Sequence, residues 1–78
     1  MRVRFTPRAR RDLEEVHEYL EIRSPIGARN VLLAIWRAVQ FIGEQPYGSE
    51  GTDDPAIRVK VVLRYRYKVF YRIRNDVI

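Results

Sequence analysis

The chain has 78 residues, of which 15 are Lys or Arg and 10 are Asp or Glu, so its formal net charge is +5 at pH 7. This length accommodates one small domain, over residues 1–78, and the absence of cysteine excludes disulfides and thiolate metal sites. No apolar run is long enough for a transmembrane helix and the charged N-terminus has no apolar signal region, so we expect a cytoplasmic protein with acidic partners.

The first expected elements are a short strand and a helix. Residues 2–5 (RVRF) alternate basic and apolar side chains, which predicts a strand. Thr6 and Pro7 then combine an N-cap hydroxyl with a ring whose fixed φ suits the first helical position. Apolar residues follow at helical spacing and predict a helix that ends near residue 23: Ala9, Leu13, Val16 and Leu20.

The charges of this first helix oppose its dipole, since Arg8 and Arg11 lie near the positive end and the Glu residues toward the negative end. Arg8 with Asp12 and Arg11 with Glu15 have the i, i+4 spacing of ion pairs, which would offset part of the cost. A basic helix start retained at this cost is a mild indication that the two arginines bind a partner.

A second helix is expected after almost no loop, because Ser24 and Pro25 repeat the cap-and-proline signal. We expect it to end near residue 42, with Gly43 as the stop signal. Leu33 and Phe41 fall on the side away from the main apolar stripe, where they either pack on the first helix or form an exposed seam for a partner. The main stripe consists of Ala28, Val31, Leu32, Ile35, Val39 and Ile42.

A loop at residues 45–56, rich in Pro, Gly, Ser and Asp, precedes the most informative stretch, residues 57–74 (IRVKVVLRYRYKVFYRIR). Both arms of this stretch alternate, with Val62 as the only break, and so predict a β-hairpin with one apolar face. The turn at residues 64–66 lacks Gly and Asn, so we expect a loop of a few residues rather than a tight two-residue turn. The expected inward residues are Ile57, Val59, Val61 and Leu63 in the first arm, and Tyr67, Val69, Tyr71 and Ile73 in the second.

The same stretch contains seven Lys or Arg residues, five of them Arg, and no acidic residue. One interpretation is that these are solvated strand residues whose stems cover the sheet. The other is a functional surface, because the planar guanidinium binds phosphate or carboxylate in a bidentate manner. After a turn at Asn75 and Asp76, Val77 and Ile78 resemble the start of a further strand that this sequence does not complete.

Motifs for catalysis or metal binding are scarce. His17 is the single histidine and has neither a Cys nor a second His as a co-ligand. Asp53 and Asp54 lie in a loop where both would stay ionised, and no Gly-rich phosphate-binding loop is present. We therefore expect no metal site and no cofactor.

The succession of strand, FTPxAxxDL helix, AxxV helix, P-x-G loop and basic YxYxVFYRI strand resembles the ParE branch of the RelE/ParE toxin superfamily. The resemblance implies a small α+β fold in which a helical hairpin packs across an antiparallel sheet. The matching residues span nearly the whole chain: Phe5, Thr6, Pro7, Ala9, Asp12, Leu13, Tyr19, Ala28, Pro46, Gly48, Arg58, Tyr67, Val69, Tyr71 and Ile73.

The resemblance also implies a toxin of a type II toxin–antitoxin pair that acts on DNA gyrase and is neutralised by a cognate ParD-like antitoxin. We expect no membrane partner and no direct sequence-specific DNA binding. Two alternatives remain, a RelE-like ribosome-dependent mRNA endoribonuclease and a degenerate antitoxin-binding module without toxicity. Lys68 aligns with a motif arginine of the ribonuclease branch, so Lys68, Arg66 and Tyr71 are weak catalytic candidates. The later basic residues and terminal Tyr of that branch would lie beyond Ile78.

These patterns give one expected fold, an α+β domain of order β-α-α-β-β with a truncated last strand and the helical hairpin on one face of a small antiparallel sheet. The expected core is Phe5, Leu13, Val16, Leu20, Val31, Leu32, Ile35, Val39, Ile42, Val59, Val61, Val69 and Tyr71. The candidate antitoxin- and target-binding residues are Arg8, Arg11, Leu33, Arg37, Phe41, Arg58, Lys60, Arg66, Lys68, Arg72 and Arg74.

Overall fold

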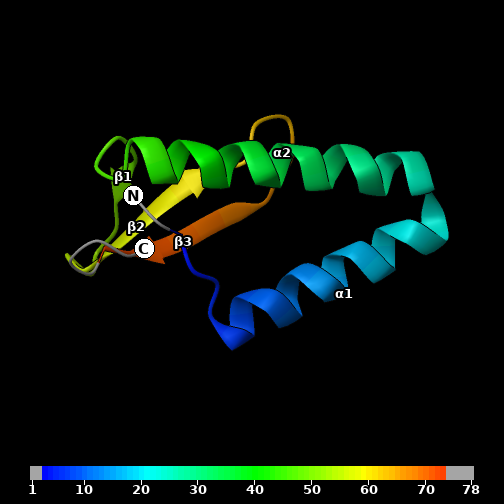
Figure 1. The fold of residues 1–78 in the computed structure, drawn as a ribbon, viewed down its shortest axis with the longest axis horizontal. Coiled ribbons are helices and arrows are strands. Elements are labelled where there is room, and N and C mark those ends of the chain that lie inside the picture. The colour runs from blue at the N-terminus through cyan, green and yellow to red at the C-terminus, as the bar shows by residue number, and fades with distance from the viewer. Residues whose placement is uncertain (1–2, 74–78) are drawn as a thin grey trace.

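The computed structural model describes residues 3–73, which form two helices followed by a three-stranded antiparallel sheet (Figure 1). The elements are α1 (Pro7–Arg23), α2 (Pro25–Glu44), β1 (Glu50–Gly51), β2 (Ile57–Val61) and β3 (Lys68–Arg72), and the strand order is β1-β2-β3. The expected α+β class, with a helical hairpin and an antiparallel sheet, is therefore confirmed.

The order of elements differs from the expected one at both ends. Residues 3–5 are not in a strand, whereas Glu50 and Gly51, inside the expected loop, pair with Val59 and Arg58 of β2. Over the described residues the order is thus α-α-β-β-β. The expected fragment of a last strand, at Val77 and Ile78, lies outside the described residues.

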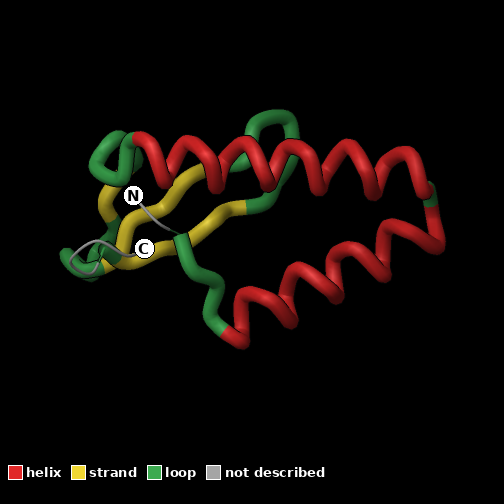
Figure 2. Tube along the Cα trace, viewed as in Figure 1, coloured by secondary structure: helices red, strands yellow, loops and turns green. Residues whose placement is uncertain are grey.

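Both helix starts are capped as the sequence predicts. The N–H of Ala9 donates to Oγ1 of Thr6, and the N–H of Gly27 donates to Oγ of Ser24, each at 3.0 Å. The N–H of Ser24 also donates to the carbonyl of Leu20 at 2.7 Å, so this one residue ends α1 and begins α2 (Figure 2). Helix α2 continues through Gly43 to Glu44, so Gly43 is not the stop that the sequence suggested.

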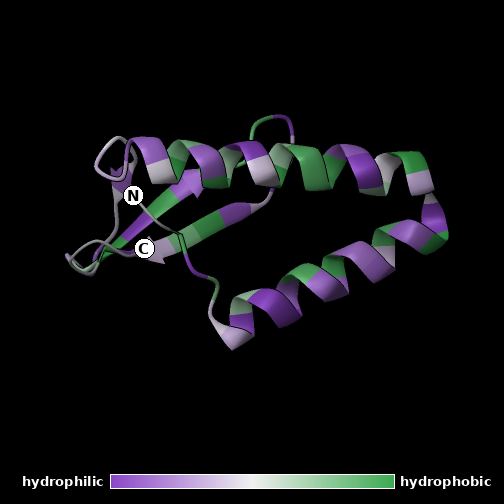
Figure 3. Ribbon diagram, viewed as in Figure 1, coloured by the Kyte–Doolittle hydropathy of each residue, from purple (hydrophilic) through white to green (hydrophobic). Residues whose placement is uncertain are grey.

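Helix α2 is the central element of the fold. It packs against α1 and against both β2 and β3, whereas α1 has no comparable contact with a strand among the described elements (Figure 1). Figure 3 shows more apolar residues along α2 than along the largely hydrophilic α1. The buried core follows this division and contains no residue of α1: Ala28, Val31, Ala38, Val39, Ile42, Val62 and Tyr71.

The expected core is confirmed at Val31, Val39, Ile42 and Tyr71. Eight further members are only half-buried: Phe5, Leu13, Val16, Leu20, Leu32, Ile35, Val59 and Val69. For the three on α1 the reason is that this helix makes no contact with a described strand. Val61 is 47% exposed, so its assignment to the core was wrong.

Strand β2 presents the opposite face from the one predicted. Directly paired residues in an antiparallel sheet point to the same side, and Arg58 pairs with the buried Tyr71 while Val59 pairs with the exposed Phe70. Val62, expected as a break in the pattern, is fully buried. The apolar residues of β2, namely Ile57, Val59 and Val61, therefore lie on the face opposite to Tyr71, which we call the outer face of the sheet. Their partners in β3 lie on the same face: Arg72, Phe70 and Lys68.

Candidate functional site

Helix α2 and the tip of the hairpin enclose a groove of about 610 Å³, which we call the hairpin groove. Four of the eleven candidate binding residues line it, namely Leu33, Arg37, Phe41 and Lys60. The far side of α2 therefore faces the hairpin tip as an open seam, with Leu33 48% exposed. The remaining lining residues are Asn30, Ala34, Ala38, Val61, Leu63, Arg64 and Tyr65, and no lining residue is acidic.

Lys60 and Phe41 connect the two sides of this groove. The Nζ atom of Lys60 lies 4.1 Å from the centroid of the Phe41 ring, within the range of a cation–π contact. This contact explains how a Lys on the inner face of β2 is tolerated beneath α2. Together with Arg37 from the helix and Arg64 from the turn, Lys60 gives the groove three cations among its apolar lining residues.

Arg58 has a structural role in the loop before β1. Its Nη1 atom donates to the carbonyl of Ser49 at 2.8 Å and lies 3.4 Å from the carbonyl of Tyr47, and its guanidinium lies 5.2 Å from the Tyr47 ring centroid. The hydroxyl of Tyr71 donates to the carbonyl of Pro46 at 2.6 Å. These two side chains attach the loop to the hairpin, so neither projects its polar group freely into the hairpin groove.

The other candidate residues are not brought together. Lys68 and Arg72 lie exposed on the outer face of the sheet, and Arg66 is exposed in the turn. Arg8 and Arg11 are exposed on the first turns of α1. Arg74 lies outside the described residues.

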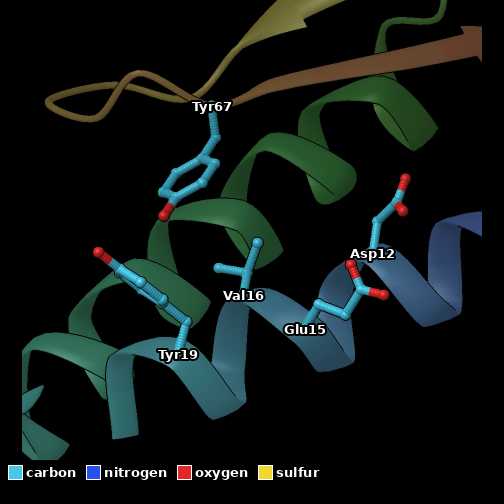
Figure 4. Close-up of a pocket in the computed structure, with 5 residues that line it drawn as sticks. All are labelled: Asp12, Glu15, Val16, Tyr19 and Tyr67. Atoms are coloured by element: carbon cyan, nitrogen blue, oxygen red, sulfur yellow. The ribbon is translucent and has the colours of Figure 1, made fainter. Parts of the chain in front are cut away.

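A second opening, between α1 and the hairpin, was not expected from the sequence (Figure 4). It is a shallow, widely open hollow of about 390 Å³, lined by Asp12, Glu15, Val16, Tyr19 and Tyr67; we call it the α1 cleft. A signal was present in the sequence, since residues 12–21 contain five carboxylates and no Lys or Arg. In a chain of net charge +5, this segment has the opposite sign.

Other kinds of site find no support in the part of the chain that the structure describes. Residues 3–73 contain no group of three or more His, Cys, Asp or Glu side chains placed to hold a metal ion. Neither helix in that range is long and apolar enough to cross a membrane.

Comparison with known proteins places the chain in one family. The model of the ParE toxin of type II toxin–antitoxin systems, parDE, matches residues 3–78. A curated relative from Sinorhizobium fredii (strain NBRC 101917 / NGR234), named "Putative toxin Y4kP", is 34% identical over 76 residues, which cover 97% of this chain and 79% of the relative. No solved structure matches the chain. The resemblance noted in the sequence is confirmed, and the chain belongs to the ParE toxin family of type II toxin–antitoxin systems.

Proposed function

We propose that this protein is a toxin that inhibits DNA gyrase in the cytoplasm and stops growth unless a cognate ParD-like antitoxin neutralises it. Membership of the ParE family supports the pairing with an antitoxin. The observation that carries the proposal is the hairpin groove, an open surface that combines apolar side chains with cations and has no acidic lining residue.

The chemistry of the hairpin groove fits an acidic amphipathic segment. Leu33 and Phe41 would receive apolar side chains, since an open apolar seam on a helix is a common docking surface for a partner helix. Arg37, Lys60 and Arg64 would attract carboxylates on the same segment and steer its approach. Lys68, Arg72 and Arg66 lie elsewhere on the surface and are available to the target while the groove holds the antitoxin.

Inhibition by binding is better supported than ribonuclease chemistry. The hydroxyl of Tyr71 donates a hydrogen bond of 2.6 Å to the Pro46 carbonyl, and Tyr71 is only 7% exposed. Lys68 lies on the outer face of the sheet, so the three weak catalytic candidates do not form one site. A general base needs to be within hydrogen-bond reach of the proton that it removes, and the Tyr71 hydroxyl would first have to give up its bond to the Pro46 carbonyl.

The proposal is tested by expressing the chain with and without the antitoxin gene and by adding the purified protein to gyrase in a supercoiling assay. We expect arrested growth without the antitoxin, normal growth with it, and loss of supercoiling in vitro. Cleavage of messenger RNA during translation with intact supercoiling would instead identify a ribonuclease. Normal growth without the antitoxin would identify an antitoxin-binding module that is not toxic.

The location of the antitoxin is tested by charge reversal on α2. Arg37→Glu alters a residue that lines the hairpin groove, whereas Arg29→Glu makes the same change at an exposed α2 position that does not line it. We expect only the first to slow association with the antitoxin, and we expect the wild-type association rate to fall as ionic strength rises, because screening shortens to about 8 Å at 0.15 M salt. Equal effects of the two variants, or a rate independent of salt, would contradict this location.

A further inference from the structure

We propose that the outer face of the sheet binds single-stranded nucleic acid, without cleaving it and with little dependence on its sequence. The three central residues of this site, Lys68, Phe70 and Arg72, do not line the hairpin groove. Because this binding needs neither gyrase nor an antitoxin, it is tested separately from the proposed function, and either can fail without the other.

The middle of β3 presents an aromatic ring to solvent. Phe70 is 63% exposed and pairs with the half-buried Val59 of β2. An exposed ring on the face of a sheet is a stacking platform for an unpaired base, and it tolerates any sequence because every base has a π face. Phe70 is therefore placed to receive one base of a single strand.

Two cations flank this ring on the same strand and the same face. Lys68 precedes Phe70 by two residues and Arg72 follows it by two. Same-face neighbours of a strand are about 7 Å apart, so both cations can reach the phosphates on either side of a base stacked on Phe70. Both side chains are exposed, and neither forms an ion pair or a side-chain hydrogen bond with another described residue. Their charges are thus available to phosphates.

The neighbouring strand adds apolar surface beside the ring. Its outward residues are Ile57, Val59 and Val61, and Val61 is 47% exposed. Apolar side chains next to an aromatic ring can cover the faces of the adjoining bases. The outer face thus combines a row of cation, ring and cation along β3 with an apolar row along β2.

The described strands place one carboxylate on this face, that of Glu50. It pairs with Val59, so it lies two strand spacings from Phe70, about 10 Å away. Lys68 and Arg72 are closer to the ring, and the chain as a whole has a net charge of +5. The charges along β3 therefore favour an anion.

This combination selects a single strand among anionic partners. In a duplex the bases already stack on one another, so the Phe70 ring would find no free base face. An acidic protein segment would be attracted by Lys68 and Arg72 but would use the ring only as apolar area. The π face of Phe70 is thus the feature that separates a nucleic acid from a protein partner.

The test measures the fluorescence anisotropy of labelled octathymidylate as the full chain is added at low salt. A matched probe has the same phosphates but abasic central positions, and octauridylate compares RNA with DNA. We expect the abasic probe to bind about fivefold more weakly, the low end of the range for one stacked base. Tighter binding of either the DNA or the RNA probe supports the proposal and identifies the source of the strand.

A pair of variants isolates the ring. Phe70→Leu keeps an apolar side chain and removes the π face, whereas Phe70→Tyr keeps the π face. We expect Phe70→Leu to weaken octathymidylate binding about fivefold and to lose the preference over the abasic probe, and we expect Phe70→Tyr to bind within twofold of the wild type. Thermal unfolding verifies that both variants fold.

A second pair of variants isolates the cations. Lys68→Gln with Arg72→Gln removes both flanking charges, and Arg10→Gln with Arg29→Gln removes the same charge from exposed positions on the two helices. Two phosphate contacts predict a slope of about −1.4 for the logarithm of the binding constant against the logarithm of salt concentration. The first variant should bring this slope close to zero and the second should leave it unchanged. Glu50→Gln should tighten binding, because it removes the carboxylate of this face.

Several results would overturn the proposal. Equal binding of the abasic probe, or equal binding by Phe70→Leu and Phe70→Tyr, would remove the role of stacking. Equal changes of the salt slope in the two double variants would remove the role of this face. Competition by polyglutamate as strong as that by octathymidylate would identify an acidic protein as the partner. Self-association of the chain that excludes the oligonucleotide would identify a second copy as the occupant.

Discussion

The N–H of Val62 donates to the carbonyl of Tyr67 at 3.0 Å, and this contact fixes the register of the hairpin. It leaves four residues, 63–66, in the turn, one more than the turn at residues 64–66 that the sequence suggested. A shift of one residue moves every side chain of a strand to the other face. The longer turn therefore buries Val62 and exposes Val61, although both belong to the same apolar run.

The register predicts a large loss of unfolding free energy at one of two neighbouring valines and a small loss at the other. Val62→Ala removes two methyl groups from a fully buried position and should lower the unfolding free energy by about 1.5–3 kcal/mol. Val61→Ala makes the same change at a residue that is 47% exposed and should cost less than about 1 kcal/mol. Urea denaturation of both variants gives the comparison, and a larger loss for Val61→Ala would mean that the register is wrong.

The same turn contains a strained residue. Arg64 has φ of 72°, a left-handed conformation that costs a non-glycine residue about 1 kcal/mol. Arg64→Gly should therefore raise the unfolding free energy by about 0.5–1 kcal/mol. Arg66→Gly, in the same turn at a residue without positive φ, should lower it slightly, because glycine loses more entropy on folding. A destabilised Arg64→Gly variant would refute the strain.

Sequence patterns predicted the parts of this fold that depend on local chemistry. The caps at Thr6 and Ser24 and the helix between them follow from hydroxyl, proline and apolar spacing, and the structure confirms them. The face of β2 depended on the turn length, and no Gly or Asn marked the ends of that turn.

The residues of the candidate sites could be predicted from the sequence only in part. Leu33 and Phe41 were singled out by their place on α2, and they do line one groove with Arg37 and Lys60. The sequence indicated only that Arg58 is a charged surface residue. Its contact with the Ser49 carbonyl could not be predicted, because the sequence did not predict β1, which directly follows Ser49. The α1 cleft was missed, since it joins Tyr67 to a helix about fifty residues earlier and such a pairing has no local signature.

The role of Arg58 in holding the loop leads to a third prediction. Arg58→Lys keeps the charge but loses the planar group that reaches two carbonyls and the Tyr47 ring. We expect the unfolding free energy to fall by about 1–2 kcal/mol, the worth of a hydrogen bond from a charged donor. Arg72→Lys, on the outer face, should be nearly neutral. Similar losses at the two positions would show that Arg58 is an ordinary surface charge.

Two serines should respond in opposite ways to replacement by alanine. Ser24 accepts a hydrogen bond from the Gly27 N–H at 3.0 Å and caps α2, so Ser24→Ala should cost about 1 kcal/mol. The Oγ atom of Ser49 is buried without a hydrogen-bond partner among the described residues, so Ser49→Ala should be neutral or stabilising. Thermal unfolding compares the two, and a substantial loss in Ser49→Ala would reveal a bond to that hydroxyl.

The outer face of the sheet predicts self-association of the isolated chain. Phe70 is 63% exposed and pairs with the half-buried Val59, so an aromatic and an aliphatic side chain lie together on the outer face. Phe70→Thr keeps a residue suited to strands and should delay aggregation, while the unfolding free energy falls by no more than about 1 kcal/mol. Light scattering across a concentration series measures the first effect and urea denaturation the second.

Lys68→Thr, on the same strand and face, removes a charge without removing apolar area and should leave aggregation the same or increase it. If Phe70→Thr aggregated at the wild-type concentration, the exposed aromatic surface would not be the cause.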